Sequence, residues 1–467
     1  MLLQVVRRYL LSPKRTRLYN QSINHRTPYS GRHMSPWATM MDALSFEEDV
    51  LFIQSAGNLP QVCLVPKDAS NQRFWGVTEH LASGEYPVYL RLPCCRISNP
   101  AQSLQAITVG SIIHSSFVDG DYSSLGNVDR PASYSRTGLG IWDSIKPDVV
   151  EYGGDFVRDS GDPPSISVHN GFTPELLRTT LLGGAERGRD DVGTSFAAPK
   201  VAHIAAQLQA TLPSEPTLLY RALIAQSARW PEWAVAAEEP LDVLQHIGYG
   251  VPSLARATEN TAYRVTMITN GLQHIRAGEA HIFQITIPHA LRMATRRLDF
   301  RIEVTLSYAS GPRRTRRRLR GYMATRAEWV ASRRGESMES FEGRIFADQP
   351  EMDSSGKSFG WFLQDRATTG KLRGTSRNSS TLQKDWATIK SNQLPETFAV
   401  AVRGRRGWSE YPDSLAKYAM TITFEAINED IEVYEPIRAI IQTEVEVGIE
   451  QQATEEVELQ LALDLNG

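Results

Sequence analysis

Residues 193–199 read GTSFAAP, and they open an Ala-rich segment that predicts a helix from Ser195 to about Thr211. A serine at the start of a helix lies where free backbone N–H groups point outward and where the helix dipole favours negative charge. That position suits a hydroxyl nucleophile, because an oxyanion forming beside it is stabilised. The proline costs little in a first turn. A plain N-cap serine has the same local pattern, so this stretch alone leaves both roles open.

The first half of the chain alternates strand and helix patterns. Short apolar runs predict buried strands, and periodic or Ala-rich runs predict helices. The predicted strands cover residues 17–23, 49–54 and 106–113. The predicted helices cover residues 2–11, 35–44, 195–211 and 216–228. Ser35-Pro36 is a good helix start, because serine caps and proline suits the first helical position. The alternation indicates an α/β architecture with a largely parallel sheet.

The pattern changes near Thr258. The β-rich stretches that follow, several with period-two alternation, are 263–269, 280–287, 298–308, 397–402 and 418–425. They predict an antiparallel β-sandwich. From Glu429 to Gly467 the chain carries eleven acidic residues and one basic residue, which is typical of an acidic tail. We therefore expect three parts, which cover 1–257, 258–428 (the β-sandwich domain) and 429–467 (the acidic tail).

The GTSFAAP stretch resembles the G-T-S-x-A-x-P nucleophile motif of the subtilisin-like serine proteases, the subtilases (peptidase family S8). Other stretches resemble further motifs of that family, in its order: YNQSIN at 19–24, SAGN at 55–58, NPA at 99–101, AITVG at 106–110, YSRTG at 134–138, IKPDV at 145–149 and GYG at 248–250. One short motif can match by chance, whereas several in order do not. The resemblance spans about residues 15–255 and implies part of a subtilisin-like parallel sheet with flanking helices.

Carried over residue by residue, the resemblance makes Ser195 the nucleophile. It makes the Asn58 side chain an oxyanion-hole donor, together with the backbone N–H of Ser195. It also implies substrate-binding segments that flank an extended polypeptide substrate. The implied substrate-binding residues are Ser22, Ile23, Asn24, Ser55, Ala56, Gly57, Gly193 and Thr194. The implied activity is that of a serine endopeptidase that forms an acyl-enzyme on Ser195.

The chain departs from the subtilase pattern in the first two catalytic motifs. The family triad runs Asp, His, Ser along the chain, and the Asp and His motifs precede the strand that YNQSIN resembles. Only residues 1–18 precede that strand here, and none of the ten histidines is followed by Gly-Thr as in the family's His motif. We expect an N-terminally truncated subtilase that is inactive as this chain. Its sheet would need the missing N-terminal half, or a partner chain, to be complete.

Three histidines are the first candidates for a general base in place of the missing one. His25 and His33 follow the predicted strand that contains YNQSIN, and His203 lies on the predicted Ser195 helix. A base must reach hydrogen-bond distance of the nucleophile. No local motif places these histidines there, so we expect surface or packing roles for them. A second class stays open as well: a non-catalytic subtilase-like protein with a binding or regulatory role.

The composition limits which binding partners and which cellular compartment we expect for this protein. The 467 residues are 41% hydrophobic and 22% charged, an ordinary globular composition. The 50 basic and 53 acidic residues nearly cancel, so we expect no nucleic-acid partner. No apolar run reaches the ~18 residues of a membrane span. Three cysteines and no signal peptide predict a cytoplasmic protein.

We expect no cofactor. No Cys/His pair has zinc spacing, and no glycine-rich phosphate loop is present. Many subtilases bind calcium, but no ligands for it can be placed in this sequence. The arginine-rich stretch 313–320 is either a solvated loop or a contact for a nucleic acid or an acidic partner. Four tryptophans of the second domain are expected in its core: Trp329, Trp361, Trp386 and Trp408.

Overall fold

The structure is a computed structural model. It describes residues 2–12, 15–65, 70–161, 164–167, 176–179, 189–293, 297–346, 357–441 and 459–461. The chain divides into two compact units, each described here by itself. The first unit comprises Met1–Ala206 and Ser227–Ser253, and the second comprises Gln207–Gln226 and Leu254–Gly467.

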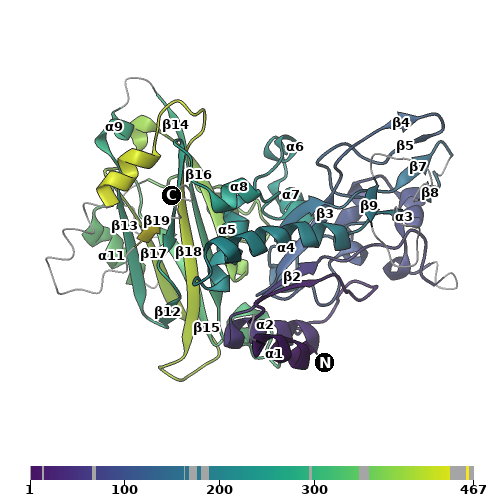
Figure 1. The fold of residues 1–467 in the computed structure, drawn as a ribbon, viewed down its shortest axis with the longest axis horizontal. Coiled ribbons are helices and arrows are strands. Elements are labelled where there is room, and N and C mark those ends of the chain that lie inside the picture. Colours follow the sequence, from purple (N-terminus) through teal and green to yellow (C-terminus); the bar gives the residue numbers. More distant parts are fainter. Residues whose placement is uncertain are drawn as a thin grey trace. The chain divides into compact units, whose positions relative to one another are not determined.

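A four-stranded parallel sheet forms the framework of the first unit (Figure 1). Its strands, in spatial order, are β1 (Leu18–Gln21), β2 (Leu51–Ser55), β3 (Ile107–Ile112) and β6 (Val149–Tyr152). Every residue of β2 and β3 is buried, as expected for a parallel sheet covered on both faces. The expected parallel sheet is confirmed. Strand β6 was not expected, because its apolar run is only Val149-Val150 before the acidic Glu151.

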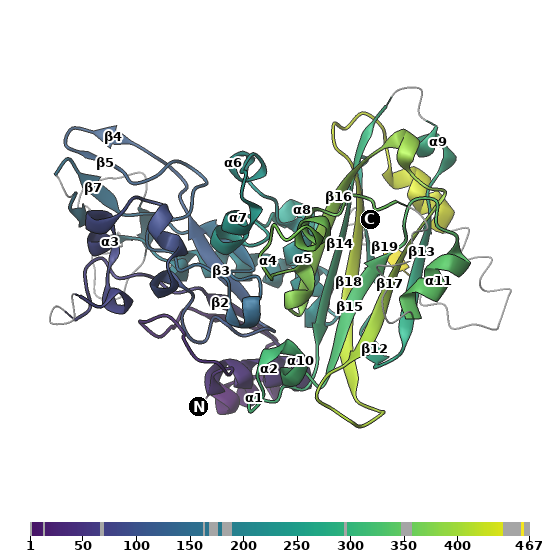
Figure 2. The same cartoon turned by 180° about the vertical axis from the view of Figure 1, so that it is seen from behind.

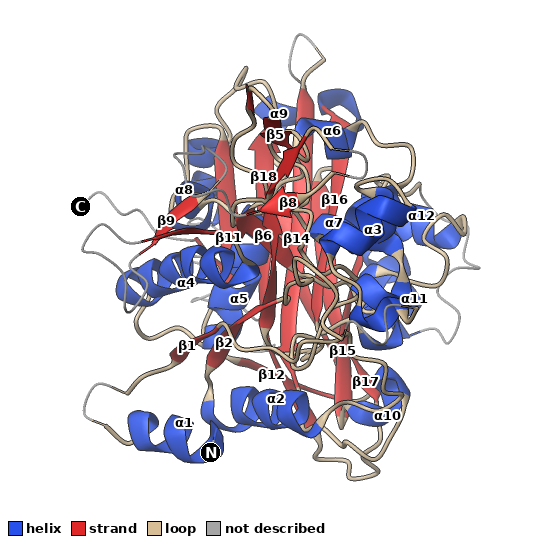
Figure 3. Cartoon of the chain, turned by 90° about the vertical axis from the view of Figure 1, so that its right-hand side faces the viewer, coloured by secondary structure: helices blue, strands red, loops and turns tan. Residues whose placement is uncertain are grey.

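Helices flank this sheet. They are α1 (Leu2–Leu10), α2 (Pro36–Glu48), α3 (Val77–Ser83), α4 (Thr194–Thr211), α6 (Glu232–Val235) and α7 (Pro240–Ile247). Helix α2 begins as expected, since the Ser35 hydroxyl accepts a 3.1 Å hydrogen bond from the Ala38 N–H and Pro36 takes the first position. Helices α1 and α2 lie side by side (Figure 3), and Val6 shares a core cluster with Phe52 of β2.

Short antiparallel strands occupy the segment between β3 and α4. One small sheet contains β4 (Val118–Asp119), β5 (Tyr122–Ser124), β7 (Val157–Asp159) and β8 (Ile166–Ser167). A separate pair is formed by β9 (Leu177–Thr179) and β10 (Arg189–Asp191). Strand β10 leads directly into the turn before α4. The sequence analysis expected none of these strands, because two or three residues carry no hydrophobic period.

Two antiparallel sheets form the second unit (Figure 2). One has the order β16-β14-β18-β11-β19, with β12 paired to β18, and the other has the order β13-β17-β15. The strands are β11 (Arg264–Thr269), β12 (Gln273–Arg276), β13 (Ala280–Thr286), β14 (Asp299–Ala309), β15 (Thr325–Ala331), β16 (Leu382–Lys390), β17 (Thr397–Arg406), β18 (Leu415–Ala426) and β19 (Leu459–Leu461). Val304 and Ile422 of the first sheet share one core with Trp329 and Val400 of the second. The expected β-sandwich is confirmed.

The second unit also has short helices. They are α5 (Thr217–Ser227), α8 (Leu254–Thr258), α9 (His289–Arg292), α10 (Arg318–Tyr322), α11 (Met338–Phe346) and α12 (Phe362–Thr368). The sequence analysis placed the α5 segment in the first domain, whereas Gln207–Gln226 belongs to the second unit. Buried bonds explain the difference: Gln226 Nε2 donates to Thr423 Oγ1 at 2.6 Å, and Lys384 Nζ donates to the Ala225 carbonyl at 3.0 Å.

Part of the segment expected to be an acidic tail is packed. Val433 and Ile437, four residues apart, are buried in the core of the second unit. Strand β19 pairs with β11. Residues 442–458 and 462–467 lie outside the described residues. The compact second unit therefore extends beyond residue 428.

Other expectations for the second unit concern its tryptophans and arginines. Trp329, Trp361 and Trp386 are buried, as predicted. The six arginines of 313–320 are all exposed, and Arg313 lies 5.2 Å from the centre of the Trp408 ring. None of the helices that the structure describes combines the length and the apolar character needed to cross a membrane.

Candidate active site

Ser195 lies in the first turn of α4, directly after the buried Thr194. As the second helical residue, Ser195 has a backbone N–H with no acceptor inside the helix. Pro199 lacks the N–H that would bond the Ser195 carbonyl four residues earlier. That carbonyl instead accepts a 3.3 Å hydrogen bond from the Ser22 hydroxyl. The proline of the motif thus frees an acceptor that ties α4 to the end of β1.

Asn58 contacts the residue that precedes Ser195. Its Oδ1 accepts hydrogen bonds from the Thr194 N–H at 3.1 Å and from the Thr194 hydroxyl at 2.7 Å. The Gly57 N–H also donates to the Thr194 hydroxyl oxygen, at 3.3 Å. A Cβ at Gly193 would lie only 3.2 Å from Asn58 Nδ2, so a larger residue there would crowd this contact. The turn before α4 and the turn after β2 therefore meet through side-chain bonds.

The remaining predicted site residues lie at the carboxyl ends of β1 and β2. These strands are parallel neighbours, so both ends fall at one edge of the sheet. Asn24 Nδ2 donates to the Ser55 carbonyl at 2.8 Å, and the Ser55 hydroxyl donates to Asn24 Oδ1 at 2.5 Å. Ile23 is 66% exposed, whereas Ala56 is buried. The structure thus brings together both predicted segments, 22–24 and 55–57, which we call the cleft segments.

A buried arginine supports this region, and the sequence analysis missed its role. The Arg136 guanidinium is 1% exposed and meets only backbone carbonyls. It donates to the carbonyls of Asn58 at 3.2 Å and of Cys94 at 3.0 Å, and also to those of Arg96 and Arg26. Burial lowers the pKa of Arg136 to about 10, so it stays charged at neutral pH. No local pattern around residue 136 could reveal four acceptors that come from three separate segments.

Tyr134 and the turn before α4 share one hydrogen-bond acceptor, the Gly153 carbonyl. Its phenol is buried and donates to the Gly153 carbonyl at 2.7 Å. The Gly193 N–H donates to the same carbonyl at 2.9 Å. Burial raises the pKa of Tyr134 well above its usual range, so the phenol remains a neutral donor. The resemblance had marked this tyrosine only as part of a motif.

The IKPDV motif contributes a buried ion pair. Lys146 Nζ lies 2.5 Å from Asp148 Oδ2, and both side chains are at most 1% exposed. Asp148 Oδ2 also accepts a 2.7 Å hydrogen bond from the Thr108 N–H of β3. The pair therefore fixes the start of β6 against β3. Its role is to hold the sheet that presents the cleft segments.

No histidine or carboxylate among the described residues is hydrogen-bonded to the Ser195 hydroxyl. His25 is exposed, and its Nδ1 lies 2.9 Å from the Thr27 hydroxyl. His203 is exposed on α4. The backbone carbonyl of His33 accepts a hydrogen bond from the Tyr29 phenol. The geometry therefore brings Ser195 and Asn58 to adjoining turns, and no described histidine or carboxylate is bonded to the Ser195 hydroxyl as a base for its proton would be.

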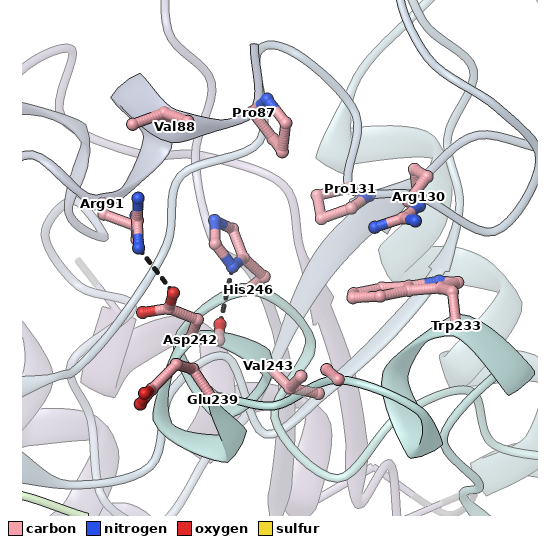
Figure 4. A pocket seen from close by; sticks show the side chains of 11 residues that line it. Pro87, Val88, Arg91, Arg130, Pro131, Trp233, Glu239, Asp242, Val243 and His246 are labelled. Carbon is pink, nitrogen blue, oxygen red and sulfur yellow. Dashed lines mark hydrogen bonds and ion pairs between the residues drawn. The ribbon is translucent and has the colours of Figure 1, made fainter. Parts of the chain in front are cut away.

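A separate cavity of about 340 Å³ lies elsewhere in the first unit, and none of the predicted site residues line it. Figure 4 shows Arg91 and Asp242 facing each other at 2.5 Å, with His246 beside them. On its other side Arg130 stacks over Trp233, 4.5 Å from the ring centre. Burial lowers the pKa of His246, which favours its neutral form.

One group of described residues could hold a metal ion: His80, Cys94 and Cys95, whose ligand atoms all lie within 4.8 Å of one another. The sequence shows no zinc spacing here, because His80 lies 14 residues before Cys94 in a segment without a recognisable ligand motif. The structure therefore adds a candidate ligand group whose members the spacing along the chain did not connect.

Comparison with known proteins identifies the family. The model of the subtilase family, Peptidase_S8, matches residues 3–250. Since this match covers more than half of the chain, the chain belongs to the subtilase family. It is 26% identical over 436 residues to the uncharacterized protein y4bN of Sinorhizobium fredii (strain NBRC 101917 / NGR234), a match that covers 88% of this chain and 92% of that protein.

Solved structures of proteases are also similar in part. One is a protease from Pseudoalteromonas arctica PAMC 21717, with 15% identity, 53% of this chain covered and a TM-score of 0.30. Another is MycP1 with its N-terminal propeptide removed, with 17% identity, 52% of this chain covered and a TM-score of 0.28. This chain spans 51% and 61% of the lengths of those two chains.

Proposed function

We propose that the first unit is the nucleophile-bearing part of a serine endopeptidase. In this proposal Ser195 attacks a peptide carbonyl and forms an acyl-enzyme. The Asn58 side chain and the Ser195 N–H bind the oxyanion of the tetrahedral intermediate. The observation that carries the proposal is the pair of bonds from Thr194 to Asn58 Oδ1.

Those two bonds orient the Asn58 carboxamide. Both Thr194 groups are donors, so they require the oxygen of the amide rather than its nitrogen. The NH₂ group is then left as a donor, and Asn58 is exposed, so a substrate oxygen can reach it. Preorganised donors are effective because they need no rearrangement when charge develops. Loss of one such donor lowers turnover by about 10²–10³-fold, a value that comes from another subtilase.

The proposed substrate is an extended polypeptide between the cleft segments. The Ala56 and Gly57 N–H groups already donate to the Val109 carbonyl and to the Thr194 hydroxyl. We therefore propose that the peptide pairs with residues 22–24, which follow the carboxyl end of β1. The exposed Ile23 offers an apolar contact at this end of β1. The free thiols of Cys63, Cys94 and Cys95 support a reducing compartment, and we propose the cytoplasm.

We further propose that the general base comes from outside residues 1–467, either from polypeptide upstream or from a partner chain. Serine is a poor nucleophile unless a base takes its proton, and the base must itself be held in one tautomer. Strand β1 has a neighbour on only one side among the described residues, so its other edge can accept an additional strand.

Labelling with a fluorophosphonate probe tests this proposal, since the probe reports an activated serine. Residues 1–467 alone should show no labelling above the Ser195→Ala control. A chain extended upstream through an Asp motif and a His motif should label strongly and lose the label in Ser195→Ala. Labelling of residues 1–467 that Ser195→Ala abolishes would reveal a base within this chain. Failure of the extended chain would favour the other candidate, a non-catalytic binding protein.

A further inference from the structure

Three metal-ligating side chains, two thiols and one imidazole, meet in the first unit. His80 comes from α3, and Cys94 and Cys95 come from a short 3₁₀ helix over Pro93–Cys95. His80 Nε2 lies 3.6 Å from Cys95 Sγ and 4.0 Å from Cys94 Sγ. The two Sγ atoms are 4.0 Å apart. One imidazole nitrogen and two sulfurs therefore converge on one point.

We propose that His80, Cys94 and Cys95 bind one Zn²⁺ ion, with the fourth coordination position open to water. Zn–S bonds of ~2.3 Å and Zn–N bonds of ~2.0–2.1 Å in a tetrahedron separate two sulfurs by roughly 3.8 Å and a sulfur and a nitrogen by roughly 3.6 Å. The observed separations match or exceed these by a few tenths of an ångström. Binding thus requires only a small inward movement of side chains.

The histidine ring is already oriented toward the sulfurs. It stacks on Tyr89 with ring centres 5.0 Å apart and an angle of 5° between the planes, and it packs against Trp75 at 66° with ring centres 5.3 Å apart. Metal-binding histidines are usually oriented by a hydrogen bond from the second ring nitrogen. The His80 Nδ1 has no hydrogen-bond partner among the described residues, so aromatic packing takes that role.

Burial and charge also favour a divalent soft cation. His80 and Cys95 are fully buried, and Cys94 is partly exposed. When Zn²⁺ binds, each thiol releases its proton to solvent and donates an electron pair. The resulting group of two thiolates, one neutral imidazole and Zn²⁺ carries no net charge, which reduces the cost of burial. Thiolate and imidazole ligands suit zinc, whereas magnesium and calcium prefer oxygen ligands.

The position of this cluster suggests what the ion does. Arg136 donates to the Cys94 carbonyl at 3.0 Å and to the Asn58 carbonyl at 3.2 Å. A zinc ion on Cys94 and Cys95 would hold this 3₁₀ helix in place, and through Arg136 the backbone at Asn58. We infer that the ion braces the turn at Asn58, a role that rests on the proposed function of Asn58 as an oxyanion donor.

The test uses the full chain, stripped of metal under reducing conditions and titrated with Co²⁺. We expect one equivalent to bind, with a thiolate-to-cobalt charge-transfer band and the visible bands of four-coordinate cobalt, both removed by Zn²⁺. Cys95→Ser and His80→Gln should weaken zinc binding by at least ~100-fold, since even the loss of an outer-shell partner costs 10–100-fold. Cys63→Ser is the matched control, because this third thiol is outside the cluster, and it should bind zinc like the unaltered chain.

A second readout does not depend on whether those variants fold. In the unaltered chain, one equivalent of Zn²⁺ should slow alkylation of Cys94 by iodoacetamide and leave alkylation of Cys63 unchanged. The proposal is overturned by any of three results: substoichiometric binding, an equal loss of binding in Cys63→Ser, or a Cys94–Cys95 disulfide that persists in a thiol buffer.

Discussion

The Ser22 hydroxyl donates a 3.3 Å hydrogen bond to the Ser195 carbonyl. This bond exists because Pro199 cannot supply the N–H that would otherwise occupy the carbonyl within α4. One side chain of the cleft segments is thereby attached to the backbone of Ser195, the proposed nucleophile. The proline in GTSFAAP thus has a tertiary role, and it can be tested directly.

The first prediction is a coupling between Ser22 and Pro199. Ser22→Ala should destabilise the chain by ~1 kcal/mol, the usual net value of a hydrogen bond. In a Pro199→Ala background the same substitution should cost almost nothing, because the alanine restores a backbone N–H that bonds the Ser195 carbonyl instead. Urea unfolding of the four chains of this double-mutant cycle measures the coupling. Equal costs in both backgrounds would show that the Ser22 bond is not controlled by the proline.

The second prediction concerns Thr194 as a positioning residue in the extended, active chain. Thr194→Val removes the hydroxyl that holds Asn58 Oδ1 at 2.7 Å and should lower kcat by roughly tenfold, with little change in KM. Thr194→Ser keeps the hydroxyl and should restore most of kcat. Asn58→Ala should lower kcat by about 10²–10³-fold, and adding Thr194→Val to it should have little further effect. If the two effects simply add, Thr194 does not act through Asn58.

The third prediction concerns the buried pair Lys146–Asp148. Lys146→Met should destabilise the chain by ~3–5 kcal/mol, because Asp148 would be left buried without its partner. Lys146→Met with Asp148→Asn should be less destabilised than Lys146→Met alone, since no uncompensated charge remains. The control is Arg7→Met at the exposed Arg7–Glu48 pair, which should cost less than ~1 kcal/mol. Thermal or urea unfolding provides the comparison.

The fourth prediction is a pH dependence in the β-sandwich. Glu328 Oε1 lies 2.8 Å from Arg403 Nε and 2.6 Å from Arg405 Nε. Burial by itself would raise the pKa of Glu328, but Arg403 and Arg405, together with Arg326, outweigh it and lower the pKa below its ordinary value of 4.5. The stabilisation from this lowered pKa is therefore complete above about pH 4.5 and is lost as the pH falls through the folded-state pKa.

Unfolding measured from pH 3 to pH 7 in the unaltered chain and in Glu328→Gln tests this dependence. We expect the variant to be less stable by ~2 kcal/mol at pH 7 and the difference to shrink as the solution becomes more acidic. Glu435→Gln, at an ion pair where the glutamate is 65% exposed, serves as the control and should show almost no difference. A difference for Glu328→Gln that does not change with pH would contradict the assignment.

Local patterns in the sequence were sufficient to predict the main strands and helices that carry the candidate site. The buried strands β2 and β3, the capped start of α2 and the helix after Gly193 depend on the order of residues within about ten positions. Apolar runs, caps and small residues at such distances act through the local backbone and through burial of one face. The order of motifs along the chain then indicated which turns would meet, and the turns after β1 and β2 and before α4 are in contact.

Only the tertiary structure decided how distant polar groups are satisfied. The four carbonyls around Arg136, the partners of α5 and the convergence of His80 with Cys94 and Cys95 all depend on contacts between segments far apart in the chain. A buried cation or imidazole must find acceptors or ligands, but its own neighbours in sequence do not specify which ones. The sequence by itself therefore determined the family motifs of this protein and the longer elements that carry the site, among them β2, β3, α2 and α4, but not the short strands. The paths of its loops determined the supports of the turn at Asn58 and the candidate zinc ligands, because those interactions exist only where the folded chain brings separate segments within hydrogen-bond or coordination distance.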